Sequence, residues 1–261
     1  MELYKAIWSG VVNGLVNLSP LSDGAHFEIF KAIIADDSEQ ISLLLAMSAL
    51  GSLFAVLFYF RLEYLALFRK SGRNKLVKLL CMAAPLCVIY LALMWLVEKV
   101  SLIMNPFFAI VMMLASSVVV LNFNQIFRQK DEKEKPMTKK RALIAGFVSC
   151  LSLLPGLSRI MLSAIAGRVQ HIKEGKSLRY AILASAPFLL MVFVRSLFMP
   201  GGAQLFSEQF GLVLIANLVS FIVTLFVLRF IMKNEEKKIV RYAAWYQATL
   251  ALLMLFFELI V

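Results

Sequence analysis

Two apolar stretches of this chain carry polar and charged side chains of the kinds that bind phosphate or move protons. The first stretch contains Asn13, Asn17, Ser22, Asp23 and His26. Because polar groups are costly inside a lipid bilayer, each of them is a candidate functional residue if the stretch lies in a membrane. The two asparagines are four residues apart, so they share one face of a helix.

The second stretch ends in a segment suited to binding an anion. Pro155 and Gly156 interrupt the apolar run, and Ser158 and Arg159 follow where a new helix is expected to begin. Residues 20–24 of the first stretch form the same kind of break followed by an expected helix start. Backbone N–H groups at a helix start attract anions, and an arginine beside them can grip two phosphate oxygens. We therefore predict four phosphate-binding residues: Ser22, Ser158, Arg159 and Ser163.

Structural explanations compete with these functional ones. Serines such as Ser149 and Ser152 often bond their own helix backbone, the two asparagines can join neighbouring helices, and the histidine can be a structural interface residue. Arg195 lies near a helix end and can extend to water. Arg159 is harder to explain structurally, because an arginine inside a membrane needs a partner or an anion; Asp23 is the acidic residue at the matching position.

The two stretches are related copies. Residues 10–23 align without a gap to residues 146–159, and six of the fourteen positions are identical. Each copy ends in a serine followed by a charged residue, Asp23 in the first and Arg159 in the second. In a membrane protein, an internal repeat that carries charge predicts a central site where two halves meet. We therefore expect Asp23 and Arg159 to meet there and to face one shared cavity.

The composition is that of an integral membrane protein. Of the 261 residues, 61% are hydrophobic and 16% are charged, which is more apolar surface than a soluble domain of this length can bury. No alternating strand pattern is present, which argues against a transmembrane barrel. Six apolar runs are near the length that a membrane-crossing helix needs: 41–60, 76–97, 106–127, 180–199, 210–232 and 242–261.

The repeat itself lies in two shorter apolar runs, 6–21 and 142–157, which contain Pro20 and Pro155. We predict that each run enters the membrane and turns back. Each hairpin is followed by three crossings. Because three is an odd number, the second half begins on the opposite side of the membrane and is inverted relative to the first. The predicted fold class is therefore all-α integral membrane, with six transmembrane helices plus two re-entrant helical hairpins in an inverted-topology repeat.

Positive charge predicts the orientation. The formal net charge is +11, and 22 of the 27 Lys and Arg residues lie in four segments: 61–78, 128–141, 168–179 and 229–241. In the predicted topology all four segments fall on one side, which the positive-inside rule makes cytoplasmic, so both termini face outward. The same placement favours contact with anionic membrane lipid and argues against a nucleic-acid partner.

The chain is predicted to form a single membrane domain, 1–261, with halves of about 1–127 and 137–261. The charged cytoplasmic linker 128–136 joins them as a tether. The three cysteines, 81, 87 and 150, lie in apolar segments without metal-ligand spacing, so we expect them to be packing residues.

Two motifs resemble those of the undecaprenyl pyrophosphate phosphatase family of the bacitracin-resistance type. Residues 10–26 resemble that family's first motif, roughly G-x-x-E-G-x-x-E-F-x-P-x-S-S-T-G-H. Residues 155–161 resemble its second, P-G-x-S-R-S-G, with Ile160 and Met161 in place of the final Ser-Gly. Residues 50–56 resemble a further family segment, L-G-S-I-L-A-V. The similarity extends along the chain in length and repeat order, so the chain is identified as a member of this family.

The resemblance implies hydrolysis of a C55 isoprenyl pyrophosphate on the outer face of the bacterial plasma membrane, which recycles the lipid carrier of cell-wall synthesis. It implies His26 as nucleophile or general acid/base, Arg159 as phosphate clamp, and Asp23 as replacement base or ligand. The family's two motif glutamates are thought to hold a divalent cation, Mg²⁺ or Ca²⁺, or to handle protons. Asn13 and Asn17 occupy those positions here, so the metal ligands stay undefined.

These departures predict altered chemistry. An amide supplies a dipole but neither a charge nor a usable base, and Asp23 can restore one negative charge at most. We expect weak or no hydrolysis of the usual kind, with a polyprenyl phosphate or pyrophosphate still as the ligand. The alternatives are a lipid-phosphate binding or translocating protein and a catalytically inactive partner, a pseudoenzyme. The oligomeric state stays open.

Overall fold

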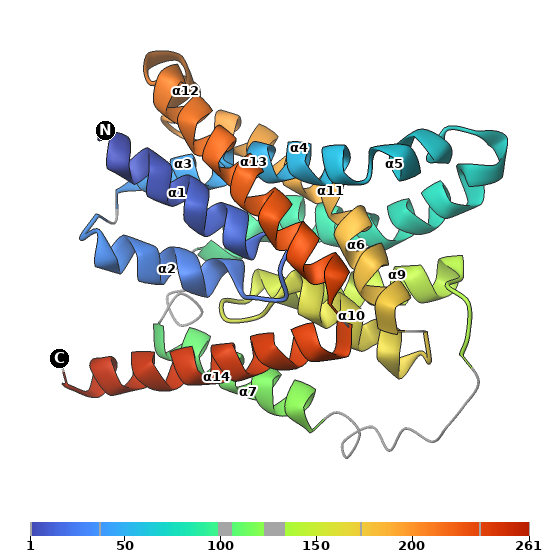
Figure 1. Cartoon of the computed structure of the whole chain (residues 1–261). Coiled ribbons are helices and arrows are strands. Elements are labelled where there is room, and N and C mark those ends of the chain that lie inside the picture. The colour runs from blue at the N-terminus through green and yellow to red at the C-terminus, as the bar shows by residue number, and fades with distance from the viewer. Residues whose placement is uncertain are drawn as a thin grey trace.

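The structure, a computed structural model, describes residues 2–36, 38–98, 106–122, 134–172, 174–234 and 236–260. In these residues the regular secondary structure is helical, apart from one isolated bridge between Lys135 and Ile172. Helices from both halves of the chain pack together in one bundle (Figure 1). The prediction of an all-α fold is confirmed for this part of the chain.

In the first half, the described residues form seven α-helices and one 3-10 turn. Their bounds are α1 Leu3–Val16, α2 Asp23–Ile33, α3 Glu39–Met47, α4 Ala49–Tyr59, α5 Arg61–Leu67, the 3-10 turn η1 Lys70–Gly72, α6 Arg73–Glu98 and α7 Pro106–Leu121. We call α1 and α2, with the break between them, the first hairpin.

The second half likewise begins with two short helices, here separated by a 3-10 turn. Its helices are α9 Lys139–Ser149, the 3-10 turn η2 Cys150–Leu153, α10 Arg159–Val169, α11 Glu174–Phe198, α12 Gly202–Glu208, α13 Phe210–Lys233 and α14 Glu236–Ile260. The second hairpin consists of α9, η2 and α10. Residues 128–133 of the predicted linker lie outside the described residues.

Both helix starts predicted after the breaks are confirmed. The Ser22 hydroxyl accepts a hydrogen bond from the Ala25 N–H at the start of α2. The Ser158 hydroxyl accepts one from the Met161 N–H, at 3.2 Å, at the start of α10. These caps satisfy N–H groups that have no partner within the helix. A serine therefore fixes where the returning helix of each hairpin begins.

The break of the second hairpin requires a glycine at position 156. Its φ of +91° is in the region that side-chain-bearing residues rarely adopt. A Cβ at this position would also lie 2.3 Å from the carbonyl oxygen of Ala109 on α7. The Pro155-Gly156 pair thus reverses the chain while keeping its backbone close against α7.

Five helical segments are long and apolar enough to cross a membrane: Glu39–Tyr59, Lys70–Ala92, Gly175–Phe198, Phe210–Lys233 and Lys238–Phe256. They match five of the six predicted runs. The sixth run, 106–127, begins with α7, whose apolar part Phe107–Leu121 is shorter, and its last residues lie outside the described part. The chain is a helical, multi-pass integral membrane protein.

The two halves make matched contacts with each other. α1 packs along α13 of the second half, and α9 packs along α6 of the first. Gly10 and Gly146 are matching positions of the repeat, and each lies in one of these contacts. A Cβ at Gly10 would lie 2.4 Å from the Ala216 carbonyl oxygen, and one at Gly146 would lie 2.4 Å from that of Met82. Small residues allow this close helix packing in membranes.

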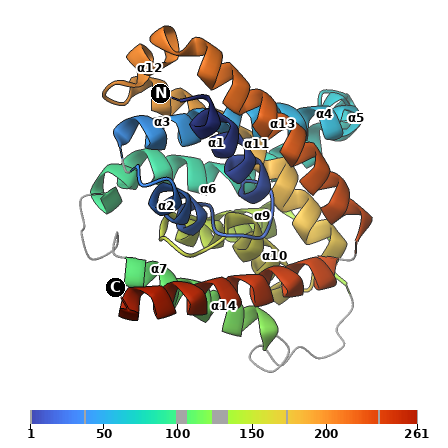
Figure 2. The same ribbon diagram turned by 60° about the vertical axis from the view of Figure 1, so that its left-hand side comes forward.

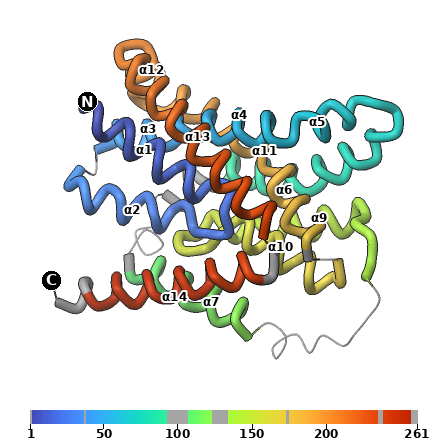
Figure 3. The backbone as a smooth tube through the Cα atoms, viewed as in Figure 1, coloured from blue at the N-terminus to red at the C-terminus, as the bar shows by residue number. Residues whose placement is uncertain are grey.

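The hairpins enter the bundle from opposite ends (Figure 1). α1 begins at the end where α12 and the last turn of α14 lie, and α2 returns toward that end. α9 begins at the other end, near α5, and α10 returns there; the backbone tube in Figure 3 follows the same path. α7 and α14 run side by side along one face, as Figure 2 shows. The two breaks consequently face each other inside the bundle.

Candidate functional site

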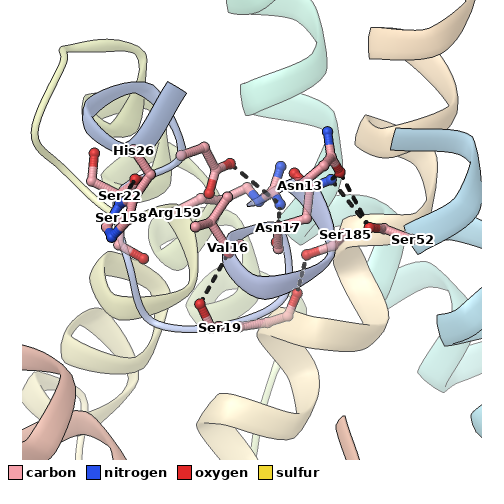
Figure 4. A network of polar contacts seen from close by, with 12 residues as sticks. Asn13, Val16, Asn17, Ser19, Ser22, His26, Ser52, Ser158, Arg159 and Ser185 are labelled. Atoms are coloured by element: carbon pink, nitrogen blue, oxygen red, sulfur yellow. Dashed lines mark hydrogen bonds and ion pairs between the residues drawn. The ribbon is translucent and has the colours of Figure 1, made fainter. Parts of the chain in front are cut away.

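Arg159 connects the two hairpins. Its Nη2 donates a hydrogen bond to the main-chain carbonyl oxygen of Asn17 at 2.6 Å and lies 4.0 Å from the Asp23 carboxylate (Figure 4). The arginine is 5% exposed, so its charge is held inside the bundle. The predicted meeting of Asp23 and Arg159 is therefore observed. It is an ion pair at a separation longer than a hydrogen bond, with a carbonyl oxygen as the direct partner.

Part of the Arg159 guanidinium has no hydrogen-bond partner among the described residues. Nε and Nη1 are buried and have no hydrogen-bond partner in the described structure. The guanidinium carbon lies 4.4 Å from the ring centroid of Phe188, a cation–π contact that holds one face of the group. A buried donor without a partner costs roughly 1–3 kcal/mol, and more when it is charged. These two N–H groups are therefore suited to an incoming anion.

Asn13 and Asn17 take part in a buried polar network on α1. The Asn17 amide donates to the Asn13 side-chain oxygen. Ser52 of α4 contacts both amides, at 3.2 Å from Asn17 and 3.3 Å from Asn13. Ser52 also bonds two hydroxyl groups of α13, Ser220 at 3.0 Å and Thr224 at 2.9 Å. The network therefore ties the first hairpin to helices of both halves.

These amides do not form a site suited to a divalent cation. Mg²⁺ and Ca²⁺ sites are built from several oxygen ligands that include carboxylates, and no three His, Cys, Asp or Glu side chains gather within the described ranges. The Asn13 amide instead donates to the Leu45 carbonyl oxygen at 2.6 Å and accepts from Asn17 and Ser52. The helix-joining explanation of the asparagines fits these contacts, and we derive no chemical step through a metal.

His26 is held at both ring nitrogens. Nδ1 lies 2.6 Å from the carbonyl oxygen of Ser22, and Nε2 lies 3.1 Å from the hydroxyl of Tyr246 on α14. The two rings are stacked, with centroids 5.6 Å apart and planes 16° from parallel. The imidazole is therefore fixed between its own helix start and the last helix of the chain.

A cavity of about 1110 Å³ lies beside the break of the first hairpin. Helices α1, α2, α13 and α14 line it, mostly with aliphatic and aromatic side chains, and its polar lining residues include Ser19, His26 and Tyr246. It exceeds the roughly 300–1,000 Å³ of common small-molecule sites. Asp23 and Arg159 do not line it, so it is not the cavity shared by both charges that the sequence predicted. His26 lines the cavity and lies one helical turn from Asp23 on α2.

The chain matches a known protein family along most of its length. The family model described as bacitracin resistance protein BacA matches residues 6–253. The chain belongs to the BacA family. The match spans both hairpins and all five apolar helical segments except the final residues of α14, so it covers the site and the helices around it.

Curated relatives of this BacA-family chain are distant in sequence but similar in length. Undecaprenyl-diphosphatase 3 of Acinetobacter baylyi is 22% identical over 263 residues, covering 98% of this chain and 98% of that protein. The undecaprenyl-diphosphatase of Porphyromonas gingivalis is 24% identical over 249 residues, covering 88% of this chain and 87% of its own. That of Acinetobacter baumannii is 22% identical over 261 residues, covering 97% and 95%.

The serines of the BacA-family chain have distinct places. Ser22 and Ser158 accept cap bonds, which leaves each O–H free to donate. Ser163 is buried on α10, one turn beyond Arg159. Ser149 bonds a carbonyl oxygen of its own helix at 2.6 Å, which is its structural explanation. Ser22 and Ser158 thus lie at the hairpin breaks, whereas Ser149 has a structural role within helix α9.

The sequence did not predict the partners of three further side chains: Ser52, Tyr246 and Arg195. Ser52 belongs to the segment 50–56, and the resemblance of that segment to the family was the one indication that it matters. No local sequence pattern predicts that Ser52 lies at the centre of the polar network. Tyr246 meets His26 from 220 residues away, so no motif reveals it. Arg195 donates to the Tyr90 hydroxyl at 3.2 Å and lies over its ring, so it has a structural partner.

Proposed function

We propose that this protein binds the phosphorylated headgroup of a polyprenyl phosphate or pyrophosphate at Arg159. The curated relatives are named undecaprenyl-diphosphatases, and the family takes part in recycling the lipid carrier of cell-wall synthesis. The observation that carries the proposal is the buried guanidinium with two N–H groups free. It lies at the start of α10, where backbone N–H groups add attraction for an anion.

The loose contact between Arg159 and Asp23 supports binding. The Asp23 carboxylate lies 4.0 Å from Nη2 and partly offsets the buried positive charge of Arg159. It does not accept a hydrogen bond from Nε or Nη1. Nε and Nη1 point along different edges of the guanidinium, so each can donate to a separate phosphate oxygen. Ser22 and Ser158 cap the two helices at this point, and we assign their O–H groups, with Ser163, as further donors to the headgroup.

The apolar cavity supports a lipid as the ligand. Its lining by α1, α2, α13 and α14 is mostly aliphatic and aromatic, and it begins at the same break whose Asn17 carbonyl receives Arg159. We propose that the polyprenyl tail occupies this cavity while the headgroup lies at Arg159.

We propose that metal-assisted hydrolysis is weak or lost. Cleaving a pyrophosphate needs the charge that moves to the leaving group to be balanced. Asn13 and Asn17 bring no charge, and their amide groups are already engaged in the network. If hydrolysis is retained, His26 acts as nucleophile or general acid/base, Arg159 clamps the phosphate, and Asp23 is the carboxylate within reach.

The membrane architecture is part of the proposal. We propose six crossings and two re-entrant hairpins within a single domain, 1–261, whose halves 1–127 and 137–261 are joined by the linker 128–136. The cross-half packing of α1 on α13 and of α9 on α6 supports this arrangement. Both ends of the chain would face outward across the bacterial inner membrane, with the basic segments in the cytoplasm.

A second candidate function is non-hydrolytic binding or translocation of a polyprenyl phosphate. The meeting of two opposed hairpin breaks inside the bundle favours it, because such breaks suit alternating access at the membrane midplane. A catalytically inactive partner that shields the lipid carrier would use the same Arg159 site. Two measurements distinguish these functions: the release of phosphate from the lipid and the movement of the lipid across the membrane.

The deciding experiment measures phosphate release from C55 pyrophosphate by the purified protein in detergent, with Mg²⁺ or Ca²⁺ added. We expect little release from the wild type and a gain in the double variant Asn13→Glu/Asn17→Glu. Binding of the lipid should be measurable in the wild type and lost in Arg159→Ala. The variant Asn17→Glu alone keeps the bond from Asn13 to Leu45 and serves if the double variant folds poorly.

The outcomes separate the candidate functions. Robust wild-type turnover that His26→Ala and Arg159→Ala abolish would overturn the proposed loss of hydrolysis. Movement of labelled lipid phosphate across liposomes without phosphate release would assign translocation. Binding without either would assign the inactive partner, and absence of Arg159-dependent binding would overturn the headgroup site itself.

A further inference from the structure

The contact between His26 and Tyr246 joins the first hairpin to the last helix of the chain. Tyr246 is on α14, which packs mainly along α7, whereas His26 is on α2. Both side chains line the apolar cavity, and Tyr246 is 47% exposed. The pair therefore bridges two elements at the wall of the cavity and is not enclosed by close packing.

The hydrogen bonds determine which nitrogen of His26 carries the proton. The Ser22 carbonyl oxygen at 2.6 Å can only accept, so Nδ1 must be the N–H donor. In the neutral ring Nε2 then has the lone pair, and the Tyr246 hydroxyl at 3.1 Å must donate to it. The nitrogen that would react with a ligand is therefore covered by a tyrosine O–H.

We propose that Tyr246 is a positioning residue for His26. Its ring fixes the plane of the imidazole by stacking, and its hydroxyl holds Nε2 until a phosphorylated headgroup takes that place. This inference rests on the proposed function, because the headgroup at Arg159 is what brings phosphate oxygens near α2. When the headgroup is bound, the Tyr246 O–H turns to a phosphate oxygen and Nε2 becomes free.

Packing alone does not account for this arrangement. A tyrosine chosen only to fill apolar space would not need its hydroxyl directed at Nε2 with the rings 16° from parallel. The neighbouring Ala243, Ala244 and Gln247 provide the buried face of α14, and Tyr246 projects from the exposed face. The tyrosine thus lies where a ligand in the cavity can reach it.

Nitrogen NMR of histidine-labelled protein in detergent tests the pairing directly. The chain has two histidines, so the spectrum is simple. His171→Asn assigns the signals, because asparagine tolerates the positive φ of 59° at that position. We expect Tyr246→Phe to shift the Nε2 resonance of His26 toward that of an unbonded imine nitrogen, while Nδ1 keeps its N–H signal.

The control removes a different hydrogen-bonded tyrosine hydroxyl. Tyr64 donates to the Leu183 carbonyl oxygen at 2.9 Å, far from the hairpin breaks in sequence and on other helices. Tyr64→Phe should leave both His26 resonances unchanged. An Nε2 resonance that is the same in the wild type and in Tyr246→Phe would overturn the proposal, whether or not the protein hydrolyses any lipid.

Ligand addition tests the positioning role without requiring turnover. Adding C55 polyprenyl phosphate should move the wild-type Nε2 resonance of His26 and leave that of Tyr246→Phe close to its starting value. If lipid binds through Arg159 and the wild-type resonance stays fixed, Tyr246 does not release His26 and the positioning role is wrong. If no lipid binds, the headgroup site of the proposed function fails, and the positioning role, which needs that headgroup, falls with it.

In a background that hydrolyses the lipid, the same variant has a kinetic signature. Tyr246→Phe should lower kcat by about tenfold, a part of the ~10²–10⁴ that a positioned acid or base contributes, with KM within about twofold. Tyr64→Phe should change neither constant. Equal losses in kcat for the two variants would mean that Tyr246 acts only through general stability.

Discussion

At the residue scale, the exchange of two glutamates for Asn13 and Asn17 changes what a buried site can do. Two carboxylates this close would repel each other unless a cation or proton lay between them. Two amides instead satisfy each other, because each has both a donor and an acceptor. The Asn17 amide donates to Asn13, and the surrounding hydroxyls complete the network. On the proposed function, the two amides therefore form a neutral structural network in place of charged residues.

Ser52 is the centre of that network, and its removal should be measurable. Its hydroxyl contacts Asn13, Asn17, Ser220 and Thr224 within 3.3 Å. Ser52→Ala leaves several of these buried groups with fewer partners, so we expect it to lower the free energy of unfolding by about 1–3 kcal/mol. Thermal unfolding in detergent measures the loss.

Ser42 is the matched control for Ser52. It lies on the neighbouring helix α3 with an exposed side chain, so Ser42→Ala should leave the melting temperature almost unchanged. Equal melting temperatures for Ser52→Ala and the wild type would show that the four contacts add nothing to stability, and the structural interpretation of the asparagines would be wrong.

At the element scale, the two copies of the sequence repeat make corresponding helix contacts: α1 packs on α13, and α9 packs on α6. Gly10 on α1 and Gly146 on α9 lie at corresponding positions, and each has a carbonyl oxygen of the opposite half 2.4 Å from where a Cβ would lie. Gly10→Ala and Gly146→Ala should each force the helices apart and destabilise the protein by about 1–3 kcal/mol. Unfolding in detergent should show similar losses for the two variants.

Gly211 is the control for these two glycines. It also lies in a helix, α13, but no neighbouring group of the described residues lies within 4 Å of where its Cβ would be. Gly211→Ala should be neutral or stabilising by up to about 1 kcal/mol, because alanine suits a helix better than glycine does. If all three variants behaved alike, helix propensity and not cross-half packing would explain the effects.

The elements could be predicted from sequence where a local rule governs them. Ser22 and Ser158 predicted the helix starts after the breaks, and long apolar runs predicted five of the membrane segments. The division of the first span at Ser48 into α3 and α4 was not predicted, because hydropathy continues across it. The short helices α5 and α12 were missed for the opposite reason, since they lie outside the long apolar runs.

The site could be predicted only in part. The meeting of Asp23 and Arg159 followed from the repeat, because matching positions of two opposed hairpins approach each other. The Asn17 carbonyl as the direct partner of Arg159, and Tyr246 as the partner of His26, depend on how the hairpins and α14 pack. Tertiary packing of this kind leaves no periodic or motif signal in one sequence.

At the scale of the whole molecule, one ion cluster joins the halves at the basic end of the bundle. Glu63 of α5 accepts hydrogen bonds from Lys75 of α6, at 2.6 Å, and from Arg179 of α11. Partial burial raises the pKa of Glu63, but the two cationic donors lower it by more, so its pKa is below the ordinary value. The ionised form is therefore favoured in the folded protein.

This shift predicts a dependence of stability on pH. Because the pKa is lower in the folded protein than in the unfolded chain, the stabilisation is present above the unfolded-state pKa of about 4.3. It is lost as the pH falls through the folded-state pKa. Between about pH 5 and pH 3 the melting temperature of the wild type should fall more steeply than that of Glu63→Gln. Glu39→Gln, with an exposed carboxyl, should follow the wild type.

The bundle has two chemically different ends, which support the proposed orientation in the membrane. Figure 1 places α12 and the outer ends of α1 and α14 at one end, and α5, the start of α9 and the α13–α14 connection at the other. Where the structure describes them, the basic segments lie at the second end, and on the positive-inside rule we propose that this end faces the cytoplasm. Ser207 on α12 and Ser71 in η1 are exposed at the two ends.

Cysteine labelling decides between the two orientations. In a background with Cys81, Cys87 and Cys150 changed to alanine, a membrane-impermeant maleimide should label Ser207→Cys in right-side-out vesicles and Ser71→Cys only in inverted ones. Labelling of both from one side would contradict an odd number of crossings between them and would remove the inverted repeat. The proposed entry of the two hairpins from opposite faces of the membrane depends on that odd number, because only then would Asp23 and Arg159 reach one depth from the two sides.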